Sequence, residues 1–328
     1  MLRLPAFDVV APDSISGVVE ALGATRARVI AGGTDLLPNL KHRLDTPPVL
    51  VSLSKLSALR FVRVDEDAGV LRIGAGVTLT ELSRNTDVRA RFPSLAHAAG
   101  IIASPLIRNM GTIGGNVNLD TRCRYVNQSE FWRSAINGCL KSGGDLCHVV
   151  PKGRSCVAAM SSDCVPVLIT LDAAIVNAGP GGERAIGVAD YYNTDGVAHL
   201  NILPGEVTTE IRVPLPSMPQ RAAYQKWTVR KSIDFPLVSV AVRFDLESDA
   251  ESAPITGAVV CVGVLAAKPK IIKRVDSLIG RSLSDPATAD VLADLVAKQG
   301  KPLDNVPYEA DYRRKMLPVY TRRALKFT

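Results

Sequence analysis

The chain has 328 residues, of which 47% are hydrophobic and 22% charged, a composition ordinary for a globular protein of two or three domains. No apolar run approaches the roughly 18 residues of a membrane span. The formal net charge of +7 is scattered and aromatic residues make up only 5%, so neither a membrane protein nor a nucleic-acid-binding protein is expected. The basic residues between 313 and 326 are typical of a solvated or subunit-contacting helix face.

The first part of the chain predicts a small α/β unit with a parallel sheet. A helix is expected over residues 14–22, where apolar residues share one face, and strands are expected over 28–30 and 49–53. The first of these strands runs directly into a glycine turn, Ala31-Gly32-Gly33-Thr34-Asp35-Leu36.

From residue 61 the pattern changes to antiparallel strands and short helices. Strands are expected over 61–64, 70–73, 165–171, 174–177 and 206–213, with Thr78 capping a short helix and another helix over 93–102. A second glycine turn, Gly111-Thr112-Ile113-Gly114-Gly115-Asn116, precedes a long stretch with neither helical nor strand periodicity. Long loops of this kind are uncommon unless they carry function.

The composition changes again near residue 219, where we expect a domain boundary. Three strands of an antiparallel sheet are predicted over 222–229, 237–244 and 255–264. Helices are predicted over 271–279, 287–298 and 312–325.

Four cysteines lie within 34 residues of the long loop, spaced Cys123-x15-Cys139-x7-Cys147-x8-Cys156. The N-terminus has no apolar segment of signal-peptide length, so we expect a reducing compartment, where clustered cysteines favour metal or redox chemistry. Structural zinc usually shows cysteine pairs separated by about two to four residues, and no pair here is so close. An iron–sulfur centre is the sharper hypothesis, with zinc or unligated thiols as alternatives. Cys164 and Cys261 lie in apolar runs and are expected to be buried hydrophobes.

The two glycine turns predict binding of a diphosphate. Glycine permits positive φ and lets backbone N–H groups approach an anion without a Cβ in the way. The hydroxyls of Thr34 and Thr112 and the amide of Asn116 would add donors. Neither turn matches the dinucleotide-binding or the triphosphatase glycine motif, so a Rossmann site and a P-loop are both unsupported.

Taken together, the two turns resemble those of the FAD-binding subunits of the molybdenum hydroxylases, the xanthine dehydrogenase and carbon monoxide dehydrogenase family. The resemblance extends along nearly the whole chain, through Ile73-Gly74-Ala75-Gly76 and through Lys226, Arg230 and Asp234-Phe235-Pro236. It implies an α+β fold of the PCMH type (VAO-like), with two α/β subdomains over about 1–56 and 57–219. Residues 220–328 would form a C-terminal domain of a three-stranded antiparallel sheet and a helical bundle.

The resemblance implies FAD-binding positions in both turns, in the strand before the first, and at three isolated positions. These are Val29, Ile30, Ala31, Gly32, Gly33, Thr34, Asp35, Leu36, Ile102, Gly111, Thr112, Ile113, Gly114, Gly115, Asn116, Asp163 and Lys226. Asp163 stands where the family has an aspartate that hydrogen-bonds flavin or ribitol, and Lys226 stands near the flavin's carbonyl edge. No residue of this chain is expected to act on the organic substrate.

Most members of the family pass directly from the second turn to an aspartate-containing loop, whereas about 40 residues intervene here, over about 120–160. This insert, with Asp120-Thr121-Arg122-Cys123 and Gly144-Asp145-Leu146-Cys147, resembles that of the β subunit in the 4-hydroxybenzoyl-CoA reductase branch. In that branch the insert binds a 4Fe–4S cluster beside the flavin. The resemblance implies that Cys123, Cys139, Cys147 and Cys156 are the cluster ligands.

The resemblance implies electron transfer in a cytoplasmic complex that is a dimer of heterotrimers. Electrons would pass from reduced ferredoxin towards a small 2Fe–2S subunit and a molybdopterin-binding large subunit, for reductive dehydroxylation of 4-hydroxybenzoyl-CoA to benzoyl-CoA. The alternative is the FAD subunit of an oxidative molybdenum hydroxylase. Basic residues of the insert would steer an acidic ferredoxin; they are Arg122, Arg124, Arg133, Lys141 and Arg154.

Overall fold

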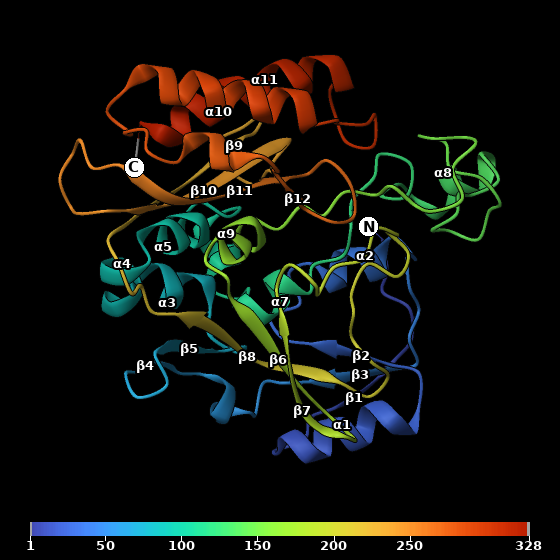
Figure 1. Cartoon of the computed structure of the whole chain (residues 1–328). Helices are drawn as coiled ribbons and strands as arrows, with labels where there is room; N and C mark the ends of the chain where they lie inside the picture. The colour runs from blue at the N-terminus through green and yellow to red at the C-terminus, as the bar shows by residue number, and fades with distance from the viewer. Residues whose placement is uncertain (1, 327–328) are drawn as a thin grey trace.

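The structure is a computed structural model that describes residues 2–326, and within them the strands form three sheets. Figure 1 shows the N-terminal and middle sheets beside each other and the C-terminal sheet above them, with helices between the middle and C-terminal sheets and over the outer face of the latter. None of the helices in the described part is long and apolar enough to cross a membrane.

The N-terminal unit has a parallel three-stranded sheet, as predicted, in the order β1-β3-β2. Its elements are β1 (Asp8–Val10), α1 (Ile15–Ala24), β2 (Ala27–Ile30), α2 (Leu36–Lys41) and β3 (Val49–Ser52). Ser14 caps α1 by accepting from the N–H of Gly17, and the apolar face of α1 buries Val18 against the sheet. The turn between β2 and α2 is the first glycine turn.

The middle of the chain forms a five-stranded antiparallel sheet in the order β4-β5-β8-β6-β7. The strands are β4 (Val62–Asp65), β5 (Val70–Gly74), β6 (Ala174–Gly179), β7 (Gly182–Gly187) and β8 (Val207–Pro214). The short helices are η1 (Ser57–Leu59), α3 (Leu79–Arg84), α4 (Thr86–Arg91), α5 (Pro93–Gly100), α6 (Pro105–Arg108), α7 (Ile113–Val117) and α9 (Cys164–Thr170). Thr78 caps α3 in a reciprocal pair with Glu81, which confirms the predicted cap.

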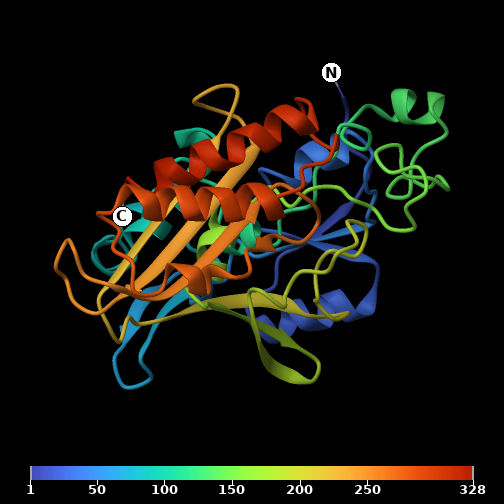
Figure 2. The same cartoon turned by 45° about the horizontal axis from the view of Figure 1, so that its top comes forward.

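The C-terminal part is an antiparallel sheet in the order β12-β11-β10-β9 with helices on both faces. Its elements are β9 (Gln220–Trp227), β10 (Val238–Leu246), β11 (Ile255–Gly263), β12 (Lys270–Ile271), η2 (Val275–Leu278), α10 (Pro286–Gln299) and α11 (Ala310–Leu325). Helices α10 and α11 lie side by side across the outer face, whereas α5 and α9 cover the inner face (Figure 2). Cys261 is fully buried in this sheet, as predicted.

Two sequence predictions of local structure were wrong. Residues 165–171 do not form a strand but belong to α9, in which every residue from Cys164 to Thr170 is buried. An apolar run buried on all sides carries no period that separates a helix from a strand. Residues 271–279 do not form one helix, because Arg274 has a left-handed φ of 65°. The short strand β12 at its start makes the C-terminal sheet four-stranded instead of three-stranded.

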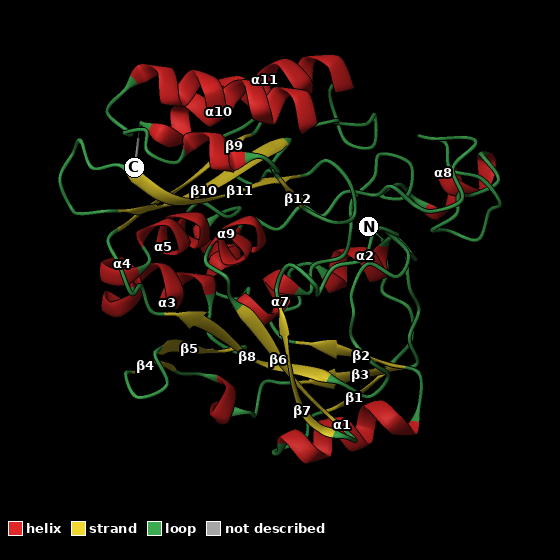
Figure 3. Cartoon of the chain, viewed as in Figure 1, coloured by secondary structure: helices red, strands yellow, loops and turns green. Residues whose placement is uncertain are grey.

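The insert projects from the side of the molecule and is mostly irregular, with one short helix, α8 (Glu130–Ala135) (Figure 3). Arg133 of α8 is only 6% exposed and donates to the backbone carbonyls of His42 and Arg43, just after α2. The N–H of Arg124 donates to the carbonyl of Asn305 near the start of α11. The insert is therefore anchored to both ends of the fold.

Candidate functional site

A cavity of about 950 Å³ lies between the N-terminal unit, the middle sheet and the base of the insert. Its walls are the first glycine turn, the second glycine turn with α7, residues 118–122 and the loop over 197–208. A volume of this size suits a large cofactor or a drug-sized ligand.

The first glycine turn presents unpaired donors to this cavity. All of Val29 to Leu36 line the cavity. Within residues 2–326 no hydrogen-bond partner is found for the backbone N–H groups from Gly32 to Leu36. Gly33 has a φ of 69°, and a Cβ on Gly32 would overlap the carbonyl oxygen of Met110. Successive free N–H groups at a concave wall form an anion-binding nest.

The second glycine turn meets the first but plays a different part. Gly111, Thr112, Gly114, Gly115 and Asn116 line the cavity, whereas Ile113 is buried outside it. The N–H groups of Ile113, Gly114 and Gly115 already donate to Val77, Ala75 and the Thr112 hydroxyl. This turn therefore does not supply the second nest of free N–H groups that the sequence predicted. It supplies close backbone approach and polar side chains.

Asp163 and Lys226 form a buried ion pair beside the cavity. The Lys226 Nζ lies 2.9 Å from Oδ1 of Asp163, and the Tyr224 hydroxyl donates to the same oxygen over 2.8 Å. Burial raises the pKa of Asp163, while Lys226 lowers it. Asp163 and Ile102 line the cavity, but Lys226 does not and reaches it only through Asp163.

Arg122, at the base of the insert, is a cavity residue that the binding-site prediction missed. Its guanidinium pairs with Asp35 and lies 4.5 Å above the ring of Phe235. Burial lowers the pKa of Arg122 to about 10. The Arg122–Asp35 pair is neutral overall, so it places an oriented dipole, not a net charge, beside the free N–H groups of the first turn.

The four cysteines of the insert converge on a second, much smaller cavity. Cys123, Cys139, Cys147 and Cys156 all line it and are between 6% and 9% exposed, and all six cysteines of the chain are free thiols. Among the described residues no group of three or more His, Cys, Asp or Glu side chains is placed to hold a single metal ion.

Burial and mutual charge both act on these thiols. Burial raises the pKa of Cys123, and the charges of Cys139 and Cys147 raise it further, against backbone hydrogen bonds from Tyr125 and Val126. Burial raises the pKa of Cys156 to about 11, although the N–H of Ala158 and the charge of Lys141 lower it. All four thiols nevertheless line the same small cavity.

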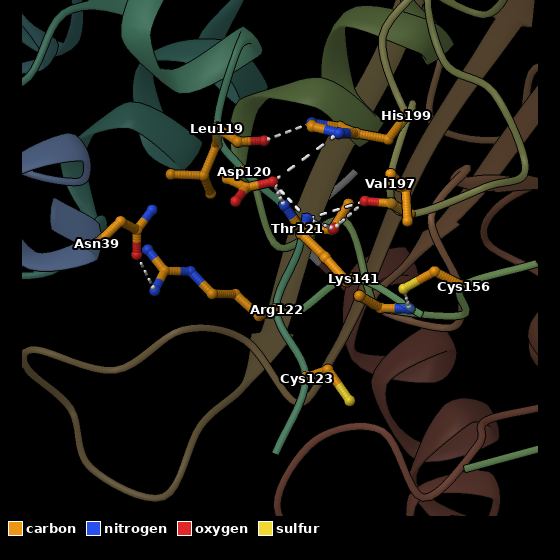
Figure 4. Close-up of polar contacts among 12 residues, drawn as sticks. Asn39, Leu119, Asp120, Thr121, Arg122, Cys123, Lys141, Cys156, Val197 and His199 are labelled. Carbon is orange, nitrogen blue, oxygen red and sulfur yellow. Dashed lines mark hydrogen bonds and ion pairs between the residues drawn. The ribbon is translucent and has the colours of Figure 1, made fainter. Parts of the chain in front are cut away.

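Lys141 lies between the two cavities and lines both. Its ammonium group donates to Asp120 Oδ1 at 2.5 Å, to Thr121 Oγ1 at 2.5 Å and to the carbonyl of Gly196 at 2.8 Å (Figure 4). Nearby, His199 lies 3.9 Å from Asp120 and 3.1 Å from the carbonyl of Leu119. Burial lowers the pKa of His199, and the charge of Lys141 adds to the effect.

The fold therefore brings together almost all residues that the sequence singled out, in two adjoining cavities. The loop over 197–208 was missed, because it carries no glycine motif and joins the site only through the fold. Three basic residues of the insert form ion pairs or hydrogen bonds within the protein: Arg122, Arg133 and Lys141. Arg124 and Arg154 remain exposed.

Comparison with known families matches the whole length of the fold. Residues 5–216 match the family described as the FAD binding domain in molybdopterin dehydrogenase. Residues 222–328 match the CO dehydrogenase flavoprotein C-terminal domain.

Individual relatives point to the same family as these two domain matches. The FAD-binding subunit of an aldehyde oxidoreductase from Escherichia coli is 35% identical over 273 residues, covering 80% of this chain and 82% of the relative. The carbon monoxide dehydrogenase medium chain of Afipia carboxidovorans is 30% identical, and the match covers 98% of this chain and 96% of the relative. Reconstituted CO dehydrogenase from Oligotropha carboxidovorans superposes with a TM-score of 0.79 at 27% identity, covering 99% of this chain and 98% of the other.

Proposed function

The chain belongs to the FAD-binding subunits of the molybdenum hydroxylase family, and on that premise we propose that it is an electron-transfer subunit with two redox groups. FAD occupies the large cavity, and a 4Fe–4S cluster is held by the four thiols of the insert. The observation that carries the proposal is the position of the insert, whose base forms a wall of the large cavity while its thiols enclose the small one.

The fit of FAD rests on the first glycine turn. Its free N–H groups from Gly32 to Leu36, with Arg122 beside them, suit the diphosphate. Asp163 is a buried acceptor fixed by Tyr224 and Lys226, in a position to orient the polar edge of a ligand. Gly115 and Asn116 allow close approach on the opposite side.

The fit of a cluster rests on the number and spread of the thiols. Four thiolates on one zinc ion lie about 3.8 Å apart, because each Zn–S bond is about 2.3 Å long. Among the described residues the insert holds no such single-ion group, so one zinc ion does not fit the four thiols as they are placed. A cluster in which each thiol binds a different iron does not require that spacing. The space between them is about 10 Å³ when measured at the centre of a water-sized sphere, which is room for about one water molecule. Coordinate bonds lie far inside van der Waals contact, so a bonded group needs less free space than its own volume.

When bound, FAD and the cluster supply two-electron and one-electron redox chemistry respectively. The residues of this chain fix the two groups close together and exclude water from the thiols. The partners of the proposal are a molybdopterin-binding large subunit and a small 2Fe–2S subunit, assembled as a dimer of heterotrimers. We also propose that the FAD-binding domain ends near residue 219, where the C-terminal domain begins.

The direction of electron flow has two candidates. The insert resembles that of 4-hydroxybenzoyl-CoA reductase, which favours electrons arriving from reduced ferredoxin for dehydroxylation of an aryl-CoA ester. The 35% identity to an aldehyde oxidoreductase subunit favours oxidation of an aldehyde, with electrons leaving through this chain. The structure weakens one argument for ferredoxin, because three of the five basic residues expected to steer it are buried or paired.

Turnover of the assembled complex distinguishes the two directions. The reductase proposal expects benzoyl-CoA from 4-hydroxybenzoyl-CoA with reduced ferredoxin or a low-potential viologen, and none with NADH. Aldehyde-dependent reduction of an artificial acceptor, without aryl-CoA reduction, would replace it with the oxidative function. A complex without bound FAD would contradict both.

A further inference from the structure

Lys141 occupies a position that neither redox group explains by itself. It comes from the insert, two residues after Cys139, yet its side chain reaches away from the insert to the wall of the large cavity. The side chain is only 11% exposed, and its three ammonium hydrogens all have acceptors. Its orientation is therefore fixed, unlike that of a solvated surface lysine.

The ammonium group ties together the segments that carry two of the thiols. Asp120 and Thr121 lie three and two residues before Cys123 in the chain. Gly196 donates from its N–H to the carbonyl of Cys156 over 2.8 Å, and Thr121 donates to the carbonyl of Gly196 over 2.9 Å. Figure 4 shows Lys141 pointing from the side of Cys156 and Cys123 towards Asp120 and Thr121.

The ion pair with Asp120 is also oriented. Lys141 lines both cavities, whereas Asp120 lines only the large one. The negative end of the pair therefore lies at the large cavity, and the ammonium group lies between Asp120 and the carbonyl of Gly196, whose N–H in turn holds the backbone of Cys156. Two other titratable side chains line the small cavity, Tyr125 and His148, whose rings stack with their centroids 5.1 Å apart. The Nε2 of His148 is held 2.6 Å from the carbonyl of Gly138. The charge of Arg133 also interacts with Cys139. Arg133 nevertheless lines neither cavity, and its guanidinium donates to backbone carbonyls.

We propose that Lys141 is a positioning residue that sets the reduction potential of the thiol-bound cluster relative to the flavin. The inference rests on the proposed cluster. A four-thiolate cluster is anionic and becomes more so when it accepts an electron. A fixed cation at low exposure stabilises the reduced form, which raises the potential, and its removal lowers the potential.

The test is a redox titration of the cluster signal by electron paramagnetic resonance in the assembled complex. Lys141→Met is compared with the parent, with Lys141→Arg as the conservative variant, and with Lys152→Met as a matched control on an exposed lysine of the same insert. At a fixed potential we expect Lys141→Met to lower the ratio of reduced to oxidised cluster about tenfold, which is about 59 mV for a one-electron couple. Lys141→Arg and Lys152→Met should stay near the parent value.

An unchanged potential in Lys141→Met, at parental iron and flavin content, would overturn the inference while leaving the proposed function intact. If Lys141→Met loses the cluster, Asp120→Asn decides, because it leaves the Lys141 charge uncompensated and should raise the potential. A potential that stays the same or falls in Asp120→Asn would also overturn the inference. A parent complex without a cluster on this chain would overturn the proposed function and the inference together.

Discussion

At the scale of single residues, Gly115 gives a sharp test of the flavin site. It lines the large cavity, and a Cβ placed there would meet only the Thr112 hydroxyl, at 3.3 Å. Gly114 is a poorer choice, because its Cβ would collide with Ala75 at 2.7 Å. We predict that Gly115→Val lowers FAD affinity at least about tenfold without unfolding the chain. Flavin content and thermal unfolding measure the two effects.

Gly181 is the matched control, since a Cβ there meets nothing within 4 Å and it lies in the turn between β6 and β7. Gly181→Val should keep its flavin. Full flavin occupancy in Gly115→Val would show that the cofactor does not approach this turn.

The cysteines give a second prediction at the same scale. Cys147→Ser should remove or convert the cluster signal while flavin remains bound, because Cys147 lines the small cavity and lies outside the large one. Cys261→Ala should leave the signal intact, because Cys261 is buried in β11, away from the small cavity. A signal that survives in Cys147→Ser but disappears in Cys261→Ala would reverse the ligand assignment.

Residue chemistry could be predicted from the sequence wherever a local pattern carries it. The four clustered cysteines and the two glycine turns are patterns of this kind, and the fold brings each of them to a cavity wall. The pairing of Lys141 with Asp120, or of Arg122 with Asp35, joins residues about 20 or more positions apart and follows only from tertiary structure. In the sequence both cations were indistinguishable from solvated basic residues of a loop.

At the scale of elements, the loop after β7 holds the thiol of Cys156 through Gly196. A Cβ on Gly196 would lie 2.9 Å from the Cys156 sulfur and 3.1 Å from the Cβ of Ala158. We predict that Gly196→Ala displaces this sulfur and lowers metal content or changes the cluster spectrum, with the flavin retained. Gly181→Ala is again the control, and parental metal content with an unchanged spectrum in Gly196→Ala would contradict the prediction.

The middle sheet depends on Glu206, which joins three of its strands. Its carboxylate accepts from Arg184 of β7 at 2.7 Å and 2.9 Å and from Asn177 of β6 at 3.3 Å, and Glu206 itself directly precedes β8. Hydrogen bonding from Arg184 lowers the pKa of Glu206 below its usual 4.5. We predict that Glu206→Gln lowers the free energy of unfolding by about 2 kcal/mol at pH 7.

The same pair predicts a pH dependence. A depressed carboxyl pKa contributes stability that is present above pH 4.5 and is lost as the pH falls through the lower folded value. The difference between parent and Glu206→Gln in urea unfolding should therefore shrink below about pH 4.5. A difference that stays constant down to pH 3 would show that the ionised pair contributes nothing.

The bounds of helices and strands could be predicted where the apolar residues lie on only one face of the element. The parallel strands β2 and β3, the cap of α3 and the long strands of the C-terminal sheet follow from alternating or helical patterns. Helix α9 could not be predicted, because the sheet packs on one side of it and α5 and α7 on others, so no polar face marks its turns.

At the scale of the whole molecule, the insert places a second candidate redox site on a flavin-binding fold without disturbing its layers. The insert leaves the chain after α7 and returns before α9, so both of its ends lie at the wall of the large cavity. The thiols are thereby brought close to the large cavity, while the insert itself projects outward (Figure 1). This arrangement suits exchange of electrons between the flavin site and a partner.

The central claim is that this chain holds both FAD and an iron–sulfur cluster. The most direct test measures iron, zinc and FAD in the anaerobically purified complex, for the parent and for a variant with alanine at Cys123, Cys139, Cys147 and Cys156. We predict that the variant keeps its FAD and lacks about four iron atoms per flavin that the parent contains. Equal iron in the two complexes, or zinc in place of iron in the parent, would contradict the account.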